Sequence, residues 1–167
     1  KTVEGPDKEG NYKIELEAYT SDVRYLTADN KGEIDIMVLM DNSNSMLGSK
    51  RKDAISAIKT VFSNLVNNYG AGTKYKANVC MYTFANSTTH RFGYRSLNKN
   101  NLSDINSKVS GIAGNLIGGT DTGLAFKTVY EKISERKKEY PDNTQVLFFL
   151  TDGVPALGVT SENSTFG

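Results

Sequence analysis

The chain has 167 residues, of which 20 are basic and 19 are acidic, giving a formal net charge of +1. This length can form one domain with a substantial core, and the near-neutral charge offers no electrostatic basis for binding nucleic acid or an anionic membrane. No apolar run approaches the roughly 20 residues that cross a bilayer, and the single cysteine, Cys80, excludes an intrachain disulfide and a thiolate metal centre.

Residues 1–10 are charged and contain Gly and Pro, which predicts a linker. Residues 12–19 then alternate apolar and polar side chains, the pattern of a half-buried strand. A strand with one polar face is typical of an antiparallel sheet, which a neighbouring domain could supply. We therefore divide the chain into residues 1–32, an N-terminal linker and strand, and residues 33–167, the main domain.

Residues 34–40 are apolar except for Asp35 and favour β structure. A short run of this kind predicts a strand buried on both faces, as in the middle of a parallel sheet. The run ends at Asp41, and Ser43 and Ser45 follow at alternate positions. In open α/β sheets, ligands bind at the carboxyl ends of central strands. These three oxygen-bearing side chains therefore indicate a site for a hard cation.

The segments that follow alternate between helices and strands. Ser49 is the predicted N-cap of a helix that continues to about Tyr69, where Gly70 stops it. The other predicted elements are a strand at 77–85 that contains Cys80 as inert core, an edge strand at 89–97, a helix at 103–109, a helix from the glycine-rich segment 118–123 to about Lys138, and a buried strand at 145–150. The basic residues from Lys132 to Lys138 predict a solvated helix end.

This order of strands and helices predicts an α/β fold with a parallel sheet and helices on both of its faces. Two strands predicted to be buried on both faces end at Asp41 and Asp152, so both carboxylates should lie at the same edge of the sheet. Thr120 follows two glycines and starts the helix that lies between those strands in the sequence. Three separate segments of the chain therefore converge on one predicted site.

The residue types at this site determine its predicted chemistry. Two carboxylates and three hydroxyls, without His or Cys, favour a hard cation, and Mg²⁺ suits so few ligands. We assign Ser43, Ser45 and Thr120 as direct ligands, and expect Asp41 and Asp152 to bind directly or through water. This set leaves at least one coordination position open, and an Asp or Glu carboxylate of another protein would be its natural occupant.

Together, these three segments carry a family resemblance. Asp41-x-Ser43-x-Ser45, then Gly-Gly-Thr120-Asp-Thr-Gly, then Leu-Thr-Asp152-Gly resemble the metal-ion-dependent adhesion site of von Willebrand factor A domains, including integrin I domains, over about residues 33–157. The resemblance implies a Rossmann-like, doubly wound, mainly parallel sheet with one antiparallel edge strand. It also implies a bound Mg²⁺, with Mn²⁺ or Ca²⁺ as alternatives, that bridges to an acidic group of a ligand, and no enzymatic activity. Asn44 stands where the family usually has glycine, which changes none of the ligand positions.

A narrower resemblance is to the A domains of Gram-positive surface adhesins and pilus-tip proteins. It implies an extracellular, cell-wall location, a role in virulence, and a partner among host matrix or cell-surface proteins or other pilin subunits. Insertion of such A domains into a stalk domain would explain the strand at 12–19. The family fold continues beyond the strand at 145–150, whose apolar edge requires a cover. We therefore expect this chain to be an N-terminal piece of a longer protein or to pair with a complementary fragment.

Several alternatives remain beside this interpretation. The loop 41–45 could be a helix cap, where Ser and Asp are also favoured, and Thr122 is the alternative threonine ligand. A haloacid-dehalogenase-type phosphatase needs a second carboxylate where Ser43 stands. A Ser-His-Asp hydrolase would have to recruit His90, the single histidine, without a nucleophile-elbow motif. A structural stalk module with a non-functional metal site, or an intracellular A-domain scaffold, is the remaining class.

Overall fold

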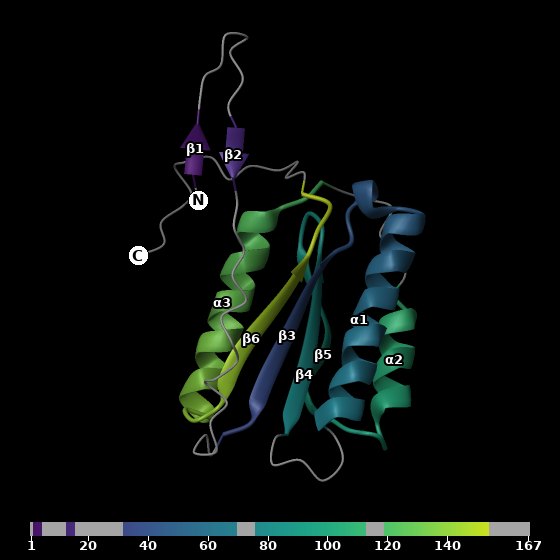
Figure 1. Ribbon diagram of the computed structural model, residues 1–167, viewed down its shortest axis with the longest axis vertical. Helices are drawn as coiled ribbons and strands as arrows, with labels where there is room; N and C mark the ends of the chain where they lie inside the picture. The colour runs from purple at the N-terminus through teal and green to yellow at the C-terminus, as the bar shows by residue number, and fades with distance from the viewer. Residues whose placement is uncertain (1, 5–12, 16–31, 70–75, 113–118, 154–167) are drawn as a thin grey trace. The chain divides into compact units, whose positions relative to one another are not determined.

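The computed structural model describes residues 2–4, 13–15, 32–69, 76–112 and 119–153, and the chain divides into two compact units, residues 1–30 and 31–167 (Figure 1). In the first unit, β1 (Thr2–Glu4) pairs antiparallel with β2 (Lys13–Glu15). The expected antiparallel pairing is thus present at Lys13–Glu15, while residues 12 and 16–19 of the predicted strand lie outside the described residues. The prediction of a linker over residues 1–10 is wrong at Thr2–Glu4, because these residues form the partner strand of that pairing.

The described part of the second unit contains a four-stranded sheet in the order β5-β4-β3-β6. Its strands are β3 (Ile34–Asp41), β4 (Ala77–Phe84), β5 (Thr88–Leu97) and β6 (Thr144–Leu150). β3 lies between β4 and β6 and is parallel to both, whereas β5 pairs antiparallel with β4. The predicted Rossmann-like α/β architecture, with one antiparallel edge strand, is therefore confirmed.

Helices cover both faces of this sheet, as Figure 1 shows. The described helices are α1 (Ser49–Tyr69), α2 (Leu102–Ser110) and α3 (Thr122–Glu139), with a 3₁₀ turn, η1, at Asn44–Met46. Alternate residues of β3 face opposite sides, so Val38 packs in the cluster that includes Phe62 of α1, and Leu39 packs in the cluster that includes Val129 of α3. Burial on both faces explains why β3 reads as an almost continuous apolar run.

The start of β3 is tied to the turn that precedes β6. The Glu33 amide donates to Asn143 Oδ1 at 2.9 Å, and the Thr144 amide donates to the Glu33 carbonyl at 2.9 Å. A Cβ on Gly32 would lie 2.0 Å from the Asp142 carbonyl oxygen, so only glycine permits this approach. These contacts fix the register of β6 against β3. The register in turn fixes the position of the carboxyl end of β6.

The prediction that β6 is buried on both faces is wrong. In the part of the chain that the structure describes, β6 pairs with β3 alone, and Phe148 and Phe149 remain 37% and 36% exposed. Phe149 packs beside Phe84 and Phe126, with ring centroids 5.8 and 4.8 Å away. Phe149 therefore extends the α3-side core out to the edge of the described sheet.

Asp35, the one polar residue in the β3 run, is buried in a network of hydrogen bonds. Its carboxylate accepts bonds from Arg136 Nε at 2.8 Å and Nη2 at 3.1 Å, and from the side-chain amides of Asn78, Asn143 and Gln145 at 2.9, 2.9 and 3.0 Å. Burial alone would raise the pKa of Asp35, but the hydrogen bonds from these four side chains outweigh it and lower the pKa. The carboxylate is therefore held ionised inside the fold.

Arg136 corrects the prediction that the basic residues from Lys132 to Lys138 form a solvated helix end. Its side chain is only 14% exposed and forms a two-point ion pair with Asp35. The guanidinium also lies over the rings of Tyr94 and Tyr140, 4.7 and 3.6 Å from their centroids. α3 is thus anchored to β3 by a buried charge pair as well as by apolar packing.

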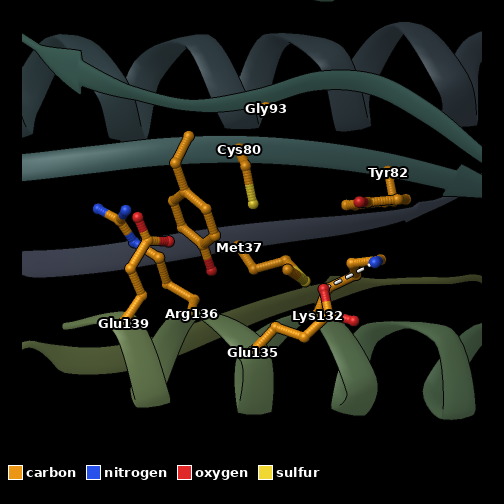
Figure 2. Close-up of a pocket in the computed structure, with 9 residues that line it drawn as sticks. Met37, Cys80, Tyr82, Gly93, Lys132, Glu135, Arg136 and Glu139 are labelled. Atoms are coloured by element: carbon orange, nitrogen blue, oxygen red, sulfur yellow. Dashed lines mark hydrogen bonds and ion pairs between the residues drawn. The ribbon is translucent and has the colours of Figure 1, made fainter. Parts of the chain in front are cut away.

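A cavity of about 270 Å³ lies between the sheet and α3 (Figure 2). Buried Cys80 lines it, together with Met37, Tyr82 and four charged residues of the helix. Burial raises the pKa of the thiol to about 12. We expect Cys80 to resist a thiol reagent such as DTNB at pH 8 in the folded protein and to react fully in denaturant. Rapid labelling under native conditions would contradict the predicted inert core position.

Candidate metal centre

The carboxyl ends of three neighbouring strands meet at one edge of the sheet. Asp41 is the last residue of β3, Asp152 lies two residues beyond β6, and Ala85 and Asn86 follow β4. β3 is parallel to both neighbours, so all three chain segments leave the sheet in the same direction. The Asn42 amide donates to the Phe84 carbonyl at 2.7 Å, which holds the ends of β3 and β4 together.

Asp41 is fully buried, and both of its carboxylate oxygens have partners. Oδ1 accepts a bond from the Ser43 amide at 2.8 Å, which closes the loop after β3. Oδ2 accepts a bond from the Thr151 hydroxyl at 2.9 Å, which links this loop to the end of β6. Asp41 therefore connects the loop after β3 with the segment that follows β6.

The hydroxyls of Ser43 and Ser45 form a line of oxygens that reaches Asp152. The two hydroxyl oxygens are 3.0 Å apart, and the Ser45 hydroxyl donates to Asp152 Oδ1 at 3.1 Å. Ser43 occupies the N-cap position of η1, but its side chain makes no capping hydrogen bond. Capping of η1 therefore does not account for the Ser43 hydroxyl, which contacts Ser45 instead.

Thr120 is buried and is positioned by the segment on either side of it. The Gly119 amide donates to Asn86 Oδ1 at 2.6 Å, and the Asp121 amide donates to the Ala85 carbonyl at 2.8 Å. Asp121 also caps α3, because its carboxylate accepts a bond from the Leu124 amide at 2.9 Å. These bonds hold Thr120 at the end of β4, whereas Thr122 is already the first residue of the helix. Gly118 lies outside the described residues.

The spacing of three of these oxygens, on Ser43, Ser45 and Asp152, is one that a small hard cation accepts. In octahedral coordination with Mg–O distances of about 2.1 Å, adjacent ligand oxygens are roughly 3 Å apart. The contacts from Ser43 to Ser45 and from Ser45 to Asp152 have this spacing. Among the described residues, no group of three or more His, Cys, Asp and Glu side chains could hold a metal. A metal at this edge would therefore depend on the hydroxyls.

Sequence reasoning missed two residues of this edge, Thr151 and Lys50. Thr151 bonds Asp41, and the Lys50 ammonium lies 2.9 Å from Asp152 Oδ2. The only local signal for Lys50 is its place in the first turn of α1, where the helix dipole favours acidic rather than basic residues. Contacts between residues more than 100 positions apart leave no other trace in the sequence.

Comparisons with known proteins show which family and which solved structures the chain is similar to. The family model for the von Willebrand factor type A domain matches residues 35–164. No curated protein matches the chain at a significant level. Among the described helices, none is both long enough and apolar enough to cross a membrane.

Several solved structures are similar to the chain, among them two of a mussel protein and one of a bacterial pilus-tip protein. Proximal thread matrix protein 1 from the mussel byssus is 22% identical, with a TM-score of 0.54 over 79% of this chain and 32% of that one. The same mussel protein with a zinc-occupied MIDAS motif is 22% identical, with a TM-score of 0.57 over 77% and 33% of the two chains. The vWF domain of the type V pili tip protein Mfa5 from Porphyromonas gingivalis is 17% identical, with a TM-score of 0.55 over 74% and 39%. The chain thus spans between about a third and two fifths of the length of these proteins.

Proposed function

Because this chain belongs to the von Willebrand factor type A domain family, we propose that it is a protein-binding domain whose binding depends on a divalent cation. The observation that carries the proposal is the line of oxygens from Ser43 through Ser45 to Asp152, beside the buried carboxylate of Asp41. The Ser43 hydroxyl makes no capping hydrogen bond and contacts Ser45 instead, which supports a ligand set built on hydroxyls.

The proposed metal ligands are the five residues found at the ends of β3, β4 and β6: Asp41, Ser43, Ser45, Thr120 and Asp152. The serine and threonine hydroxyls would bind directly, and the two carboxylates directly or through water. This donor set favours Mg²⁺, with Mn²⁺ or Ca²⁺ as alternatives. When bound, the cation supplies positive charge for an acidic group of a partner. The protein residues hold that charge at the edge of a rigid sheet.

The proposed partner is an Asp or Glu side chain of a host extracellular-matrix or cell-surface protein. Ser45 is exposed, so a ligand could approach the edge of the sheet from solvent. The similarity to a pilus-tip protein supports a bacterial cell-surface location. We also propose that residues 1–32 belong to a neighbouring stalk domain. The antiparallel pairing of β1 with β2 supports that assignment.

We propose no enzymatic role for the chain. Ser43 occupies the position where a phosphatase of the dehalogenase type requires a carboxylate, and its hydroxyl contacts Ser45. His90 is exposed on β5 and packs beside the ring of Tyr82, with centroids 4.9 Å apart. Neither arrangement supports a nucleophile with an adjacent base.

One observation favours a second candidate, a structural module that works without metal. The Lys50 ammonium already neutralises Asp152, at 2.9 Å from its Oδ2. A domain that never binds a cation would benefit from this internal counter-ion. In that case the chain would be a stalk component or scaffold, and divalent cations would not change its stability.

A metal titration of the intact chain separates the two candidates. Thermal unfolding would be followed with Mg²⁺, with Mn²⁺ and with a chelator. Metal at about a hundred times its dissociation constant should add roughly 2.7 kcal/mol to the free energy of unfolding if it binds only the folded state. No upward shift with either metal, in a sample shown by circular dichroism to be folded, would reject the metal-dependent function and leave the structural module.

A further inference from the structure

Lys50, the second residue of α1, contacts the proposed metal ligand Asp152 across the edge of the sheet. Its Nζ lies 2.9 Å from Asp152 Oδ2, while the Ser45 hydroxyl bonds Oδ1 at 3.1 Å. The Asp152 side chain is 9% exposed and that of Lys50 is 57% exposed. A largely exposed ammonium therefore shares this shielded carboxylate with a residue of the proposed metal site.

The start of α1 is an unfavourable place for this positive charge. The first turn of α1 contains Lys50, Arg51 and Lys52 and no acidic residue. The amino end of a helix carries a partial positive charge, which stabilises anions and destabilises cations. Asp152 offsets that cost for Lys50. The favourable contact of Lys50 is thus with the carboxylate that it faces and not with the helix dipole.

We propose that Lys50 is a built-in counter-ion of Asp152 that competes with the divalent cation for this carboxylate; the inference rests on the proposed metal-binding function. With Lys50 in contact, Asp41, Asp152 and the ammonium together carry one net negative charge instead of two. A cation entering the site must either displace the ammonium or bind beside a like charge. Lys50 thereby lowers the affinity for metal and holds Asp152 in place when metal is scarce.

Lys50 disfavours binding of the metal, but once the cation is bound its positive charge favours binding of an acidic ligand. A divalent cation with two carboxylates is neutral overall, whereas the addition of Lys50 leaves one net positive charge at the edge. Lys50 is exposed enough to face an approaching ligand, and such a charge attracts acidic groups. Lys50 would therefore make metal binding weaker and the metal-loaded edge more attractive to a carboxylate.

The test compares Lys50→Gln with Lys52→Gln in the intact chain. Lys52 is exposed on the same first turn, so its replacement removes the same charge at almost the same distance from the helix end. Isothermal titration with Mg²⁺ and Mn²⁺ gives the dissociation constants, and thermal unfolding in chelator gives the stability without metal. We expect Lys50→Gln to lower the dissociation constant about three- to ten-fold, and Lys52→Gln to change it little.

Lys50→Gln should bind metal more tightly but be less stable when metal is absent. Lys50→Gln leaves Asp152 without its ammonium, so its melting temperature in chelator should fall below that of Lys52→Gln. Equal dissociation constants in the two variants, or weaker metal binding by Lys50→Gln, would overturn competition by Lys50 while leaving the metal site intact. Binding by Lys50→Gln where the parent binds nothing would support it. Absence of binding in the folded parent and in both variants would reject the proposed function and this inference together.

Discussion

Asp41→Ala should abolish the stabilisation that Mg²⁺ or Mn²⁺ gives to the folded chain. The parent is expected to gain roughly 2.7 kcal/mol at a hundred times the dissociation constant, and the variant close to nothing. Asp41 is buried and bonds both the Ser43 amide and the Thr151 hydroxyl. Its removal therefore deletes a charge and also loosens two of the loops that carry the other ligands. Thermal unfolding with metal and with chelator measures the difference.

The matched control for this charge change is Asp53→Ala, an exposed position on α1 that should leave the metal response intact. Because Asp41→Ala could lower stability by itself, a second variant keeps the prediction testable. Ser45 is exposed, and Ser45→Ala removes one hydroxyl of the line without emptying a buried position. We expect it to weaken metal binding by roughly tenfold or more, whereas Ser56→Ala on α1 should not. An unchanged metal response in both Asp41→Ala and Ser45→Ala would exclude this edge as the site.

Asp35→Asn should be the most destabilising of these substitutions, by about 3–5 kcal/mol in the free energy of unfolding. The variant leaves the guanidinium of Arg136 largely buried without its anion. It also weakens bonds from Asn78, Asn143 and Gln145, which all donate to this carboxylate. Arg136→Lys should cost less than Asp35→Asn, because the charge remains while the two-point geometry is lost. Urea denaturation at pH 7 measures both effects.

The pH dependence of stability follows from the lowered pKa of Asp35. A carboxyl whose pKa is lower in the folded than in the unfolded state contributes stability that is fully present above the unfolded value, about 3.9. That contribution is lost as pH falls through the lower folded value. The difference in stability between the parent and Asp35→Asn should therefore be constant near neutral pH and become smaller below about pH 4. A difference that grew on acidification would contradict this assignment.

The exposed pair Lys132–Glu135 on the same helix provides the comparison for this buried pair. Lys132 Nζ lies 2.7 Å from Glu135 Oε2, yet both side chains are exposed to solvent. Solvent screening makes such pairs weak, so Glu135→Gln should change stability far less than Asp35→Asn. A similar loss in both variants would show that the Asp35–Arg136 contact has no special structural role.

The proposed ligand residues could be recognised from the sequence because strand direction decides where they lie. Each of Asp41 and Asp152 follows an apolar run, and parallel strands with helical connections bring their carboxyl ends to one edge. The glycines before Thr120 mark a loop that enters a helix. The partners of these residues were not predictable in the same way. Thr151 has no pattern of its own, and its bond to Asp41 joins residues 110 positions apart.

The sequence by itself determined the α/β class, the order of the main elements of the second unit, the central place of β3 and the residues proposed to bind metal. These features depend on local periodicity and on the direction of strands, which apolar patterns and turn residues specify. The tertiary structure alone decided that β6 leaves Phe148 and Phe149 partly exposed, that Asp35 holds Arg136, and that Lys50 reaches Asp152. Each of these depends on charges or edges brought together from distant parts of the chain, and long-range pairing is set by packing rather than by neighbouring residues.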